Sequence, residues 1–195
     1  MEIIKLKNFK EEDFFEEFTN WLQKDLNQVN KIILETLETD SSLITELSGY
    51  IIGAGGKRIR PLLTLATARL CQYVGNRHLN LASVIEFIHT ATLLHDDVVD
   101  GSKKRRGKKT ANFIWGNKSS ILVGDFLLSK AFKVLINDGS LKCIDIISNV
   151  SEKISFGEVK QLMSVGNLNM SESDYLEIIG YKTAELFSAA CQLSA

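Results

Sequence analysis

Apolar side chains recur at steps of three and four residues from residue 11 to residue 38, and this periodicity constrains the fold more than any other feature. The spacing places apolar groups on one face of an α-helix, whereas a half-buried strand would alternate every second residue. Pro61 is the single proline among 195 residues. Because proline interrupts helix interiors, its scarcity favours long helices over turn-rich β structure. The sequence therefore predicts an all-α fold.

Further helices are expected in close succession along the chain. The pattern places them at residues 42–52, 61–74 and 79–100, in a short piece near Asn112, and at 119–137, 140–166 and 171–195. Ser171 is a typical N-cap residue with Asp174 at the third helical position. The apolar stretch 186–195 carries no helix stop signal, so we expect the final helix to continue. Residues 1–195 are interpreted as one helical domain, the N-terminal portion of a longer protein and incomplete at its C-terminal end.

The composition is that of an ordinary globular protein, with 45% hydrophobic residues and a net charge of −1. The longest stretch free of charged residues, 161–171, has eleven residues. A membrane-spanning helix needs about 18 apolar residues, so no transmembrane segment is expected. Three cysteines, odd in number and outside any C-x-x-C motif, indicate buried thiols in a reducing compartment. We therefore expect a cytoplasmic protein.

Three carboxylates, Asp96, Asp97 and Asp100, lie near the end of the helix expected at 79–100. Asp96 and Asp100 are one turn apart, which separates their β-carbons by about 5–6 Å and makes them repel one another without a cation. Acidic residues at a helix C-terminus also oppose the helix dipole. One or two carboxylates completed by water and phosphate suit Mg²⁺ better than zinc. A magnesium site is favoured over the alternative of an exposed acidic helix end.

Two basic elements accompany these carboxylates. Six cations follow Asp100 within nine residues: Lys103, Lys104, Arg105, Arg106, Lys108 and Lys109. Such a run alone would indicate a solvated loop or a nucleic-acid patch, but guanidinium groups beside a metal site can hold diphosphate oxygens. The second element, residues 55–61, is a glycine-rich turn before a helix N-terminus, where anions are favoured. It lacks the spacing of a Walker A loop.

His89 lies two helical turns before Asp96 on the same helix face. A single histidine on an apolar face is commonly a core residue with a satisfied hydrogen bond. Here its position also allows hydrogen bonding near a bound phosphate. Both readings remain open from the residues alone.

Taken together, the motifs resemble those of the trans-polyprenyl diphosphate synthase family. The similarity rests on Gly55-Gly56-Lys57-Arg58-Ile59-Arg60-Pro61, on the segment from Glu86 to Asp100 ending in Asp-Asp-x-x-Asp, and on Arg105-Arg106-Gly107. Gly124-Asp125-Phe126-Leu127-Leu128, Gly157-Glu158-Val159-Lys160-Gln161-Leu162 and Tyr181-Lys182-Thr183-Ala184 follow in the family's order. The resemblance implies an isoprenoid-synthase-type helical bundle around a central cavity with two facing aspartate-rich motifs. The first motif is present, and the second would lie beyond residue 195.

The resemblance also implies roles for individual residues. Asp96 and Asp100 would bind Mg²⁺ with Asp97 beside them, and Arg105 would grip an allylic prenyl diphosphate. Lys182 and Thr183 match positions that contact the same diphosphate. Isopentenyl diphosphate would be held by Lys57, Arg60, His89 and Arg106. A homodimer is implied as well.

The implied reaction agrees with the residue types. Breaking an allylic carbon–oxygen bond releases diphosphate, so the barrier falls when charge on that leaving group is neutralised and no side-chain nucleophile is required. Ala91 and Thr92 lie one turn before the first aspartate, where bulky side chains would limit the growing prenyl chain. Neither is aromatic. We therefore expect a long all-trans product of the octaprenyl kind, such as a quinone side-chain precursor.

Three alternative functions compete with this interpretation. A non-catalytic partner subunit of a prenyl synthase would typically lose the aspartates, which are intact here. A metal phosphohydrolase of the HD type would need histidines to converge on a metal, and the chain has only His78, His89 and His95. Nucleic-acid binding would use the basic run alone, and we expect none. Because the second aspartate-rich motif is missing, we expect the 195 residues to be inactive on their own.

Overall fold

The computed structural model describes residues 11–53 and 56–195, and this part of the chain is mostly helical. The first four helices are α1 (Glu11–Thr36), α2 (Ser42–Ile52), α3 (Ile59–Leu70) and α4 (Arg77–Val99). They are followed by α5 (Ala111–Trp115), α6 (Asn117–Asp138), α7 (Leu141–Ser164), α8 (Glu172–Ile179), the π-helix η1 (Gly180–Ala184) and α9 (Glu185–Gln192). The predicted all-α fold is confirmed.

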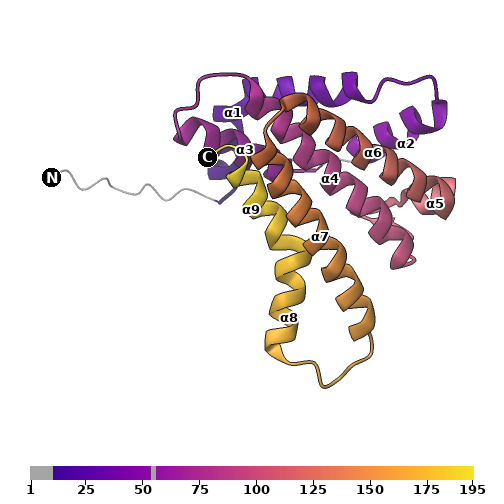
Figure 1. Ribbon diagram of the computed structural model, residues 1–195. Coiled ribbons are helices and arrows are strands. Elements are labelled where there is room, and N and C mark those ends of the chain that lie inside the picture. Colours follow the sequence, from indigo (N-terminus) through magenta and orange to yellow (C-terminus); the bar gives the residue numbers. More distant parts are fainter. Residues whose placement is uncertain (1–10, 54–55) are drawn as a thin grey trace.

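Helix α4 is the central element of the bundle. It packs against α1, α3, α6 and α9, and Figure 1 shows it crossing the middle of the molecule. Its buried apolar side chains surround it on several faces, as expected for a helix enclosed by others. Phe87, Ile88 and Leu94 are among the largest fully buried side chains of the chain. The polar residues in the middle of α4 therefore lie on a well-packed helix.

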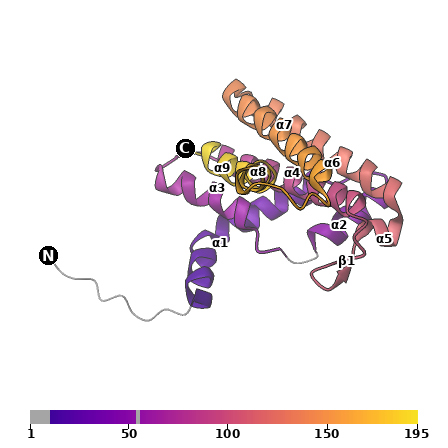
Figure 2. The same cartoon turned by 90° about the horizontal axis from the view of Figure 1, so that it is seen from below.

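Helix α8 and the outer part of α7 project from the bundle (Figure 1), and η1 connects α8 to α9, which packs against α3, α4 and α7 (Figure 2). Gly157 of α7 lies against η1 so closely that an added β-carbon would stand 2.9 Å from Tyr181 Cβ and 3.0 Å from the Lys182 backbone nitrogen. Real β-carbons do not approach other atoms this closely. The glycine therefore permits η1 to lie directly on α7.

The helix bounds differ from the sequence expectations in the last helix and in helix α3. The last helix is interrupted by η1, although its Ser171 cap accepts a hydrogen bond from the Asp174 backbone nitrogen as predicted. Helix α3 begins at Ile59, two residues before Pro61, which still falls in the first turn where a missing N–H has no helical partner.

The basic run after α4, expected to be a loop, contains a short antiparallel ribbon. Strand β1 (Lys104–Arg105) pairs with β2 (Lys108–Lys109), with Lys104 opposite Lys109. The two residues between the strands, Arg106 and Gly107, have φ angles of +51° and +78°. Positive φ at both central residues is typical of a tight hairpin turn. The ribbon gives these cations fixed positions.

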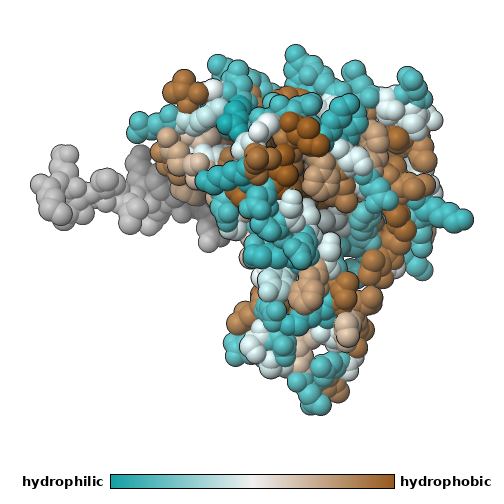
Figure 3. Space-filling view, in the orientation of Figure 1, coloured by the Kyte–Doolittle hydropathy of each residue, from teal (hydrophilic) through white to brown (hydrophobic). Residues whose placement is uncertain are grey.

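The surface carries several large apolar side chains. Figure 3 shows them as separate patches on the face in view. Those on α6 and α7 include Ile121, Leu122, Phe132, Ile136, Val159, Leu162 and Met163. Among the helices that the structure describes, none has the length and hydropathy needed to cross a bilayer.

The three cysteines are free, but the expectation that all are buried is wrong for Cys71. Cys71 lies at the C-terminal end of α3, where the chain turns away from the core. Cys143 is buried and Cys191 is half-buried.

Candidate functional site

A cavity of about 330 Å³ lies between the turn before α3, helix α4, the tip of the basic ribbon and α9. The four residues that sequence reasoning grouped together all line it: Lys57, Arg60, His89 and Arg106. They come from three separate segments of the chain. The structure thus brings the two basic elements and the histidine to one place.

Arg60 and His89 form the inner wall of this cavity. Arg60 donates a hydrogen bond from Nη1 to Nε2 of His89 at 3.2 Å, and its guanidinium carbon lies 4.2 Å from the centre of the Phe187 ring. Burial, helped by Arg60 and the other nearby arginines, lowers the pKa of His89 to about 3. His89 is therefore neutral at physiological pH, so the positive charge of this wall belongs to arginine.

A buried ion pair between Arg58 and Glu86 supports the cavity, and sequence reasoning missed it. Arg58 adopts a left-handed conformation with φ +50° at the N-cap of α3. Its guanidinium donates to the Glu86 carboxylate and, at 2.8 Å, to the Ile52 carbonyl oxygen. Burial raises the pKa of Glu86, and the charges of Arg58, Arg60 and Arg106 oppose that shift. One signal was available, because Glu86 is the single acidic residue between positions 79 and 95.

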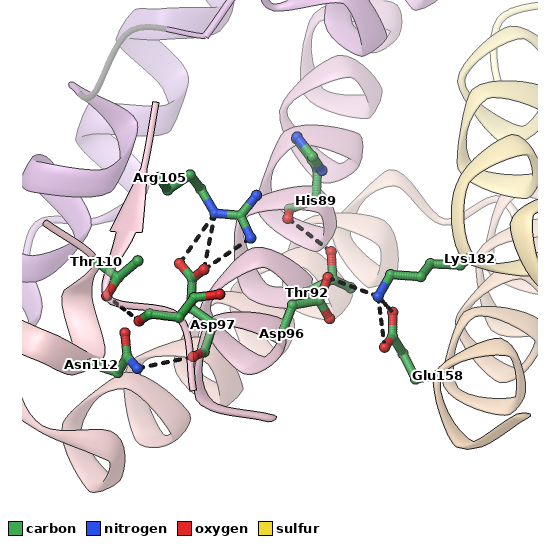
Figure 4. Close-up of polar contacts among 10 residues, drawn as sticks. His89, Thr92, Asp96, Asp97, Arg105, Thr110, Asn112, Glu158 and Lys182 are labelled. Atoms are coloured by element: carbon green, nitrogen blue, oxygen red, sulfur yellow. Dashed lines mark hydrogen bonds and ion pairs between the residues drawn. The ribbon is translucent and has the colours of Figure 1, made fainter. Parts of the chain in front are cut away.

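Asp97 faces the basic ribbon and is almost completely buried. Its carboxylate accepts hydrogen bonds from Arg105 Nε at 3.1 and 3.2 Å and from Nη2 at 2.9 Å (Figure 4). Asn112 donates to the Asp97 carbonyl oxygen at 2.9 Å. Asp97 thus anchors the ribbon to the end of α4, and the Arg105 guanidinium is engaged by this carboxylate.

Asp96 points to the opposite side, toward α7 and η1. Lys182 Nζ lies 2.8 Å from Glu158 Oε1, 2.9 Å from Oε2 and 3.6 Å from Asp96 Oδ2 (Figure 4). Burial and the neighbouring Glu158 raise the pKa of Asp96 to about 6. Glu158 belongs to the sequence motif at residues 157–162, but the sequence predicted no role for it. Thr183, the neighbour of Lys182, is exposed.

The residues at the end of α4 fit a magnesium ion. Within residues 11–53 and 56–195, no three His, Cys, Asp or Glu side chains stand together as a complete metal site. Mg²⁺ does not require one, because it commonly takes one or two carboxylates and completes its shell with water and phosphate oxygens. Asp100 is exposed and near enough to contribute to the raised pKa of Asp96. The ammonium of Lys182 shows that this carboxylate cluster accommodates a positive charge.

The three histidines do not converge on a metal. The His78 ring packs edge-on against the Tyr73 ring, and His89 Nε2 accepts a hydrogen bond from Arg60. His95 Nε2 lies 3.5 Å from Asp125 Oδ1. Each contact is in a different part of the bundle. The arrangement contradicts a phosphohydrolase site of the HD type.

Ala91 and Thr92 lie between His89 and Asp96 on α4. Ala91 has no exposed surface and belongs to the core. Thr92 is half-buried, and its hydroxyl donates to the His89 carbonyl oxygen at 2.9 Å (Figure 4). Of the two positions, Thr92 is therefore the one with surface open to a ligand.

Comparison with known proteins places this arrangement in a family. A model of the polyprenyl synthetase family matches residues 41–195. Octaprenyl diphosphate synthase of Escherichia coli is 50% identical over 171 residues, which cover 88% of this chain and 53% of that protein. The all-trans-nonaprenyl-diphosphate synthase of Rhodobacter capsulatus is 38% identical over 184 residues, covering 94% of this chain and 57% of its own length.

Solved structures give the same result. The polyprenyl synthase of Caulobacter crescentus, complexed with calcium and isoprenyl diphosphate, has a TM-score of 0.91 and 47% identity over 93% of this chain and 55% of that one. The decaprenyl diphosphate synthase of Rhodobacter capsulatus has a TM-score of 0.90 and 47% identity, covering 92% and 56%. The fold is thus the all-α fold of isoprenoid synthases. The chain spans about half the length of these relatives, and it belongs to the polyprenyl synthetase family.

Proposed function

We propose that this chain is the part of a long-chain trans-prenyltransferase that binds isopentenyl diphosphate and one end of an allylic prenyl diphosphate. The observation that carries the proposal is the placement of two charged sites on one helix. The cationic cavity surrounds His89, and the carboxylate cluster begins at Asp96. Seven residues of α-helix separate the two by about 10 Å, which leaves room for a five-carbon unit between two diphosphate sites.

In this proposal, the end of α4 activates the leaving group. Asp96 and Asp100 would hold Mg²⁺, which when bound neutralises charge on the diphosphate and so favours its departure. Lys182 lies beside Asp96 and reaches the same anion, and Thr183 is exposed next to it. Asp97 contributes indirectly, because it holds the Arg105 guanidinium near the site. Preorganised cations of this kind lower the barrier without a covalent intermediate.

The cavity holds the second substrate in this scheme. Lys57, Arg60 and Arg106 present the positive charges for isopentenyl diphosphate, and neutral His89 offers hydrogen bonding without competing for charge. Arg58 and Glu86 keep the turn before α3 in place. The alkene would thereby be positioned next to the ionising carbon, which supplies the orientation that the reaction needs.

The product is proposed to be a long all-trans prenyl diphosphate of the octaprenyl kind. The small side chains of Ala91 and Thr92, one turn before Asp96, leave no aromatic barrier along this face of α4. The similarity to octaprenyl, nonaprenyl and decaprenyl diphosphate synthases supports the same length class. Such a product suits a quinone side-chain precursor.

Three further features belong to the proposal. The chain alone would not turn over, because it carries one aspartate-rich motif. Exposed apolar side chains such as Phe132 and Ile136 on α6 support a homodimer that buries them. The unpaired thiols of Cys71, Cys143 and Cys191 agree with a reducing compartment such as the cytoplasm.

Calorimetric titration with isopentenyl diphosphate tests the proposed cavity in the chain itself. We expect binding that is weakened about tenfold or more in Arg60→Gln, since a charge-assisted hydrogen bond to phosphate is lost. Lys160→Gln is the matched control, because it removes one cation on the outer part of α7, where Lys160 pairs with Glu177 of α8. Equal binding by both variants would contradict the cavity as the site.

Turnover is tested in the full-length protein with Mg²⁺, an allylic diphosphate and radiolabelled isopentenyl diphosphate. We expect a product of octaprenyl length from the full-length protein and none from residues 1–195 alone. Robust turnover by the 195-residue chain would refute the expected inactivity. A product that stops at farnesyl diphosphate would refute the proposed length class.

A further inference from the structure

Lys182 occupies the position of a cation between two carboxylates that come from different helices. Its ammonium is 2.8 Å from Glu158 Oε1 on α7 and 3.6 Å from Asp96 Oδ2 on α4. The Lys182 and Glu158 side chains are 22% and 25% exposed, and that of Asp96 is 15% exposed. Screening by water is therefore limited, and each of these charges depends on its partners.

The backbone holds Lys182 in this position. Lys182 lies in the middle of η1, where the wider π-helical turn shifts side chains relative to a regular α-helix. Gly157 allows η1 to press against α7 directly beside Glu158, the next residue in the chain. The T-shaped contact between Phe156 and Tyr181, with ring centres 5.8 Å apart, fixes the same junction from the other side. Lys182 is therefore aimed at Asp96 by local packing.

The two contacts of Lys182 differ in kind. Both Glu158 oxygens lie within hydrogen-bonding distance of Nζ, whereas Asp96 is an ion-pair partner at longer range. A divalent cation that binds Asp96 competes with the ammonium for this carboxylate. If a diphosphate arrives with the cation, the ammonium gains an oxyanion as a new partner while it keeps Glu158.

We propose that Lys182 is a built-in counter-cation that couples divalent-cation binding to diphosphate binding. It occupies Asp96 when the anion is absent and moves to the anion when both ligands are present, with Glu158 as the anchor throughout. The metal alone is then bound weakly, and the metal together with diphosphate is bound tightly. This inference rests on the proposed function, because it assigns the metal and the diphosphate to the end of α4.

The test is calorimetric titration of Mg²⁺ into the chain, with and without saturating inorganic pyrophosphate, after subtraction of the heat of Mg²⁺ binding to pyrophosphate alone. Lys182→Gln is expected to bind Mg²⁺ about fivefold more tightly than the unchanged chain when pyrophosphate is absent, because the competing charge is gone. Its affinity is expected to increase less on adding pyrophosphate. A loss of coupling of about fivefold or more is within the usual range for linked sites.

Glu158→Gln is expected to change the Mg²⁺ affinity in the opposite direction. It removes a negative charge and leaves Asp96 as the single carboxylate partner of Lys182, so Mg²⁺ alone is expected to bind more weakly. A variant that merely disturbed the packing would weaken Mg²⁺ binding in both cases. Lys160→Gln is the matched control, since it also removes a lysine of an α7–α8 ion pair and is expected to leave Mg²⁺ affinity unchanged.

The outcomes separate this inference from the proposed function. Unchanged or weaker Mg²⁺ binding by Lys182→Gln, or unchanged or tighter binding by Glu158→Gln, would overturn the coupling role while the proposed function stands. A chain that binds no Mg²⁺ in any variant, even with pyrophosphate, would contradict the proposed site and the coupling together.

Discussion

Buried charges are compensated in opposite ways at the middle and at the end of helix α4. In the middle, several arginines surround one buried carboxylate, Glu86, which lies against Arg58. At the end, the carboxylates of Asp96 and Glu158 surround one ammonium, Lys182. The first region carries excess positive charge, which favours binding of an anion. The second region carries excess negative charge, which favours binding of a cation.

In the proposed function, this difference would let one helix position two substrates at separate places. In that proposal, arginines that are already in position attract a diphosphate to the cavity. At Asp96, the same anion is repelled unless a cation accompanies it. We therefore propose that the middle of α4 binds its ligand without metal, whereas its end binds an anion only together with metal.

The largest expected effect concerns the end of the helix. Asp96→Asn in the full-length protein should lower turnover by about 10³-fold, since charge stabilisation at the leaving group is lost. Steady-state assays at saturating Mg²⁺ measure this. Asp97→Asn is the comparison, because that carboxylate holds Arg105 rather than facing Lys182. Equal losses in the two variants would contradict the division of roles between these neighbours.

The second prediction concerns the buried carboxylate in the middle of the helix. Glu86→Ala should lower the free energy of unfolding by about 3 kcal/mol, because it leaves the Arg58 charge buried without its partner. Urea unfolding of the chain followed by circular dichroism measures the change. Glu177→Ala removes an exposed ion pair with Lys160 and should cost less than about 1 kcal/mol. A Glu86 effect no larger than that of Glu177 would show that this carboxylate is not a structural counter-charge.

The third prediction uses pH. The unfolded chain protonates His89 near its ordinary pKa of 6.5, whereas the folded chain holds the pKa at about 3. Protonation of His89 therefore stabilises the unfolded state as the pH falls through 6.5. Between about pH 7 and pH 5, this should lower the free energy of unfolding by about 2 kcal/mol. His89→Gln should lose correspondingly less stability over that interval in urea titrations. Parallel curves for the two chains would refute a buried neutral histidine.

The smallest effect on stability is expected at the half-buried Thr92. Thr92→Phe should shorten the product of the full-length protein, because an aromatic ring one turn before Asp96 narrows the space for the growing chain. Ala91→Phe is a poorer probe, since Ala91 is fully buried and overpacking costs about 1–3 kcal/mol. Thin-layer chromatography of the dephosphorylated products gives the length. An unchanged octaprenyl product would remove Thr92 from the chain-length determinants.

Local sequence patterns predicted the helices, and the family resemblance predicted which residues share the cavity. Periodic apolar residues and caps depend on neighbours within a few turns, which a single sequence displays. The family resemblance grouped Lys57, Arg60, His89 and Arg106, and the structure places all four around one cavity.

Features that depend on contacts between distant segments were missed. The π-helix η1 requires the space that Gly157 leaves on α7, and nothing within residues 180–184 reveals this. Glu158 becomes part of the site only because α7 brings it to Lys182. Asp97 differs from Asp96 only by its direction on the helix, and its pairing with Arg105 depends on the ribbon that follows.

A crystal structure of the chain with Mg²⁺ and inorganic pyrophosphate would show whether the end of α4 binds both ligands together. We expect metal density at Asp96 and Asp100, with the anion contacted by Lys182 and the Lys182 ammonium moved away from Asp96. Metal and pyrophosphate bound elsewhere, with Lys182 still between Asp96 and Glu158, would contradict it.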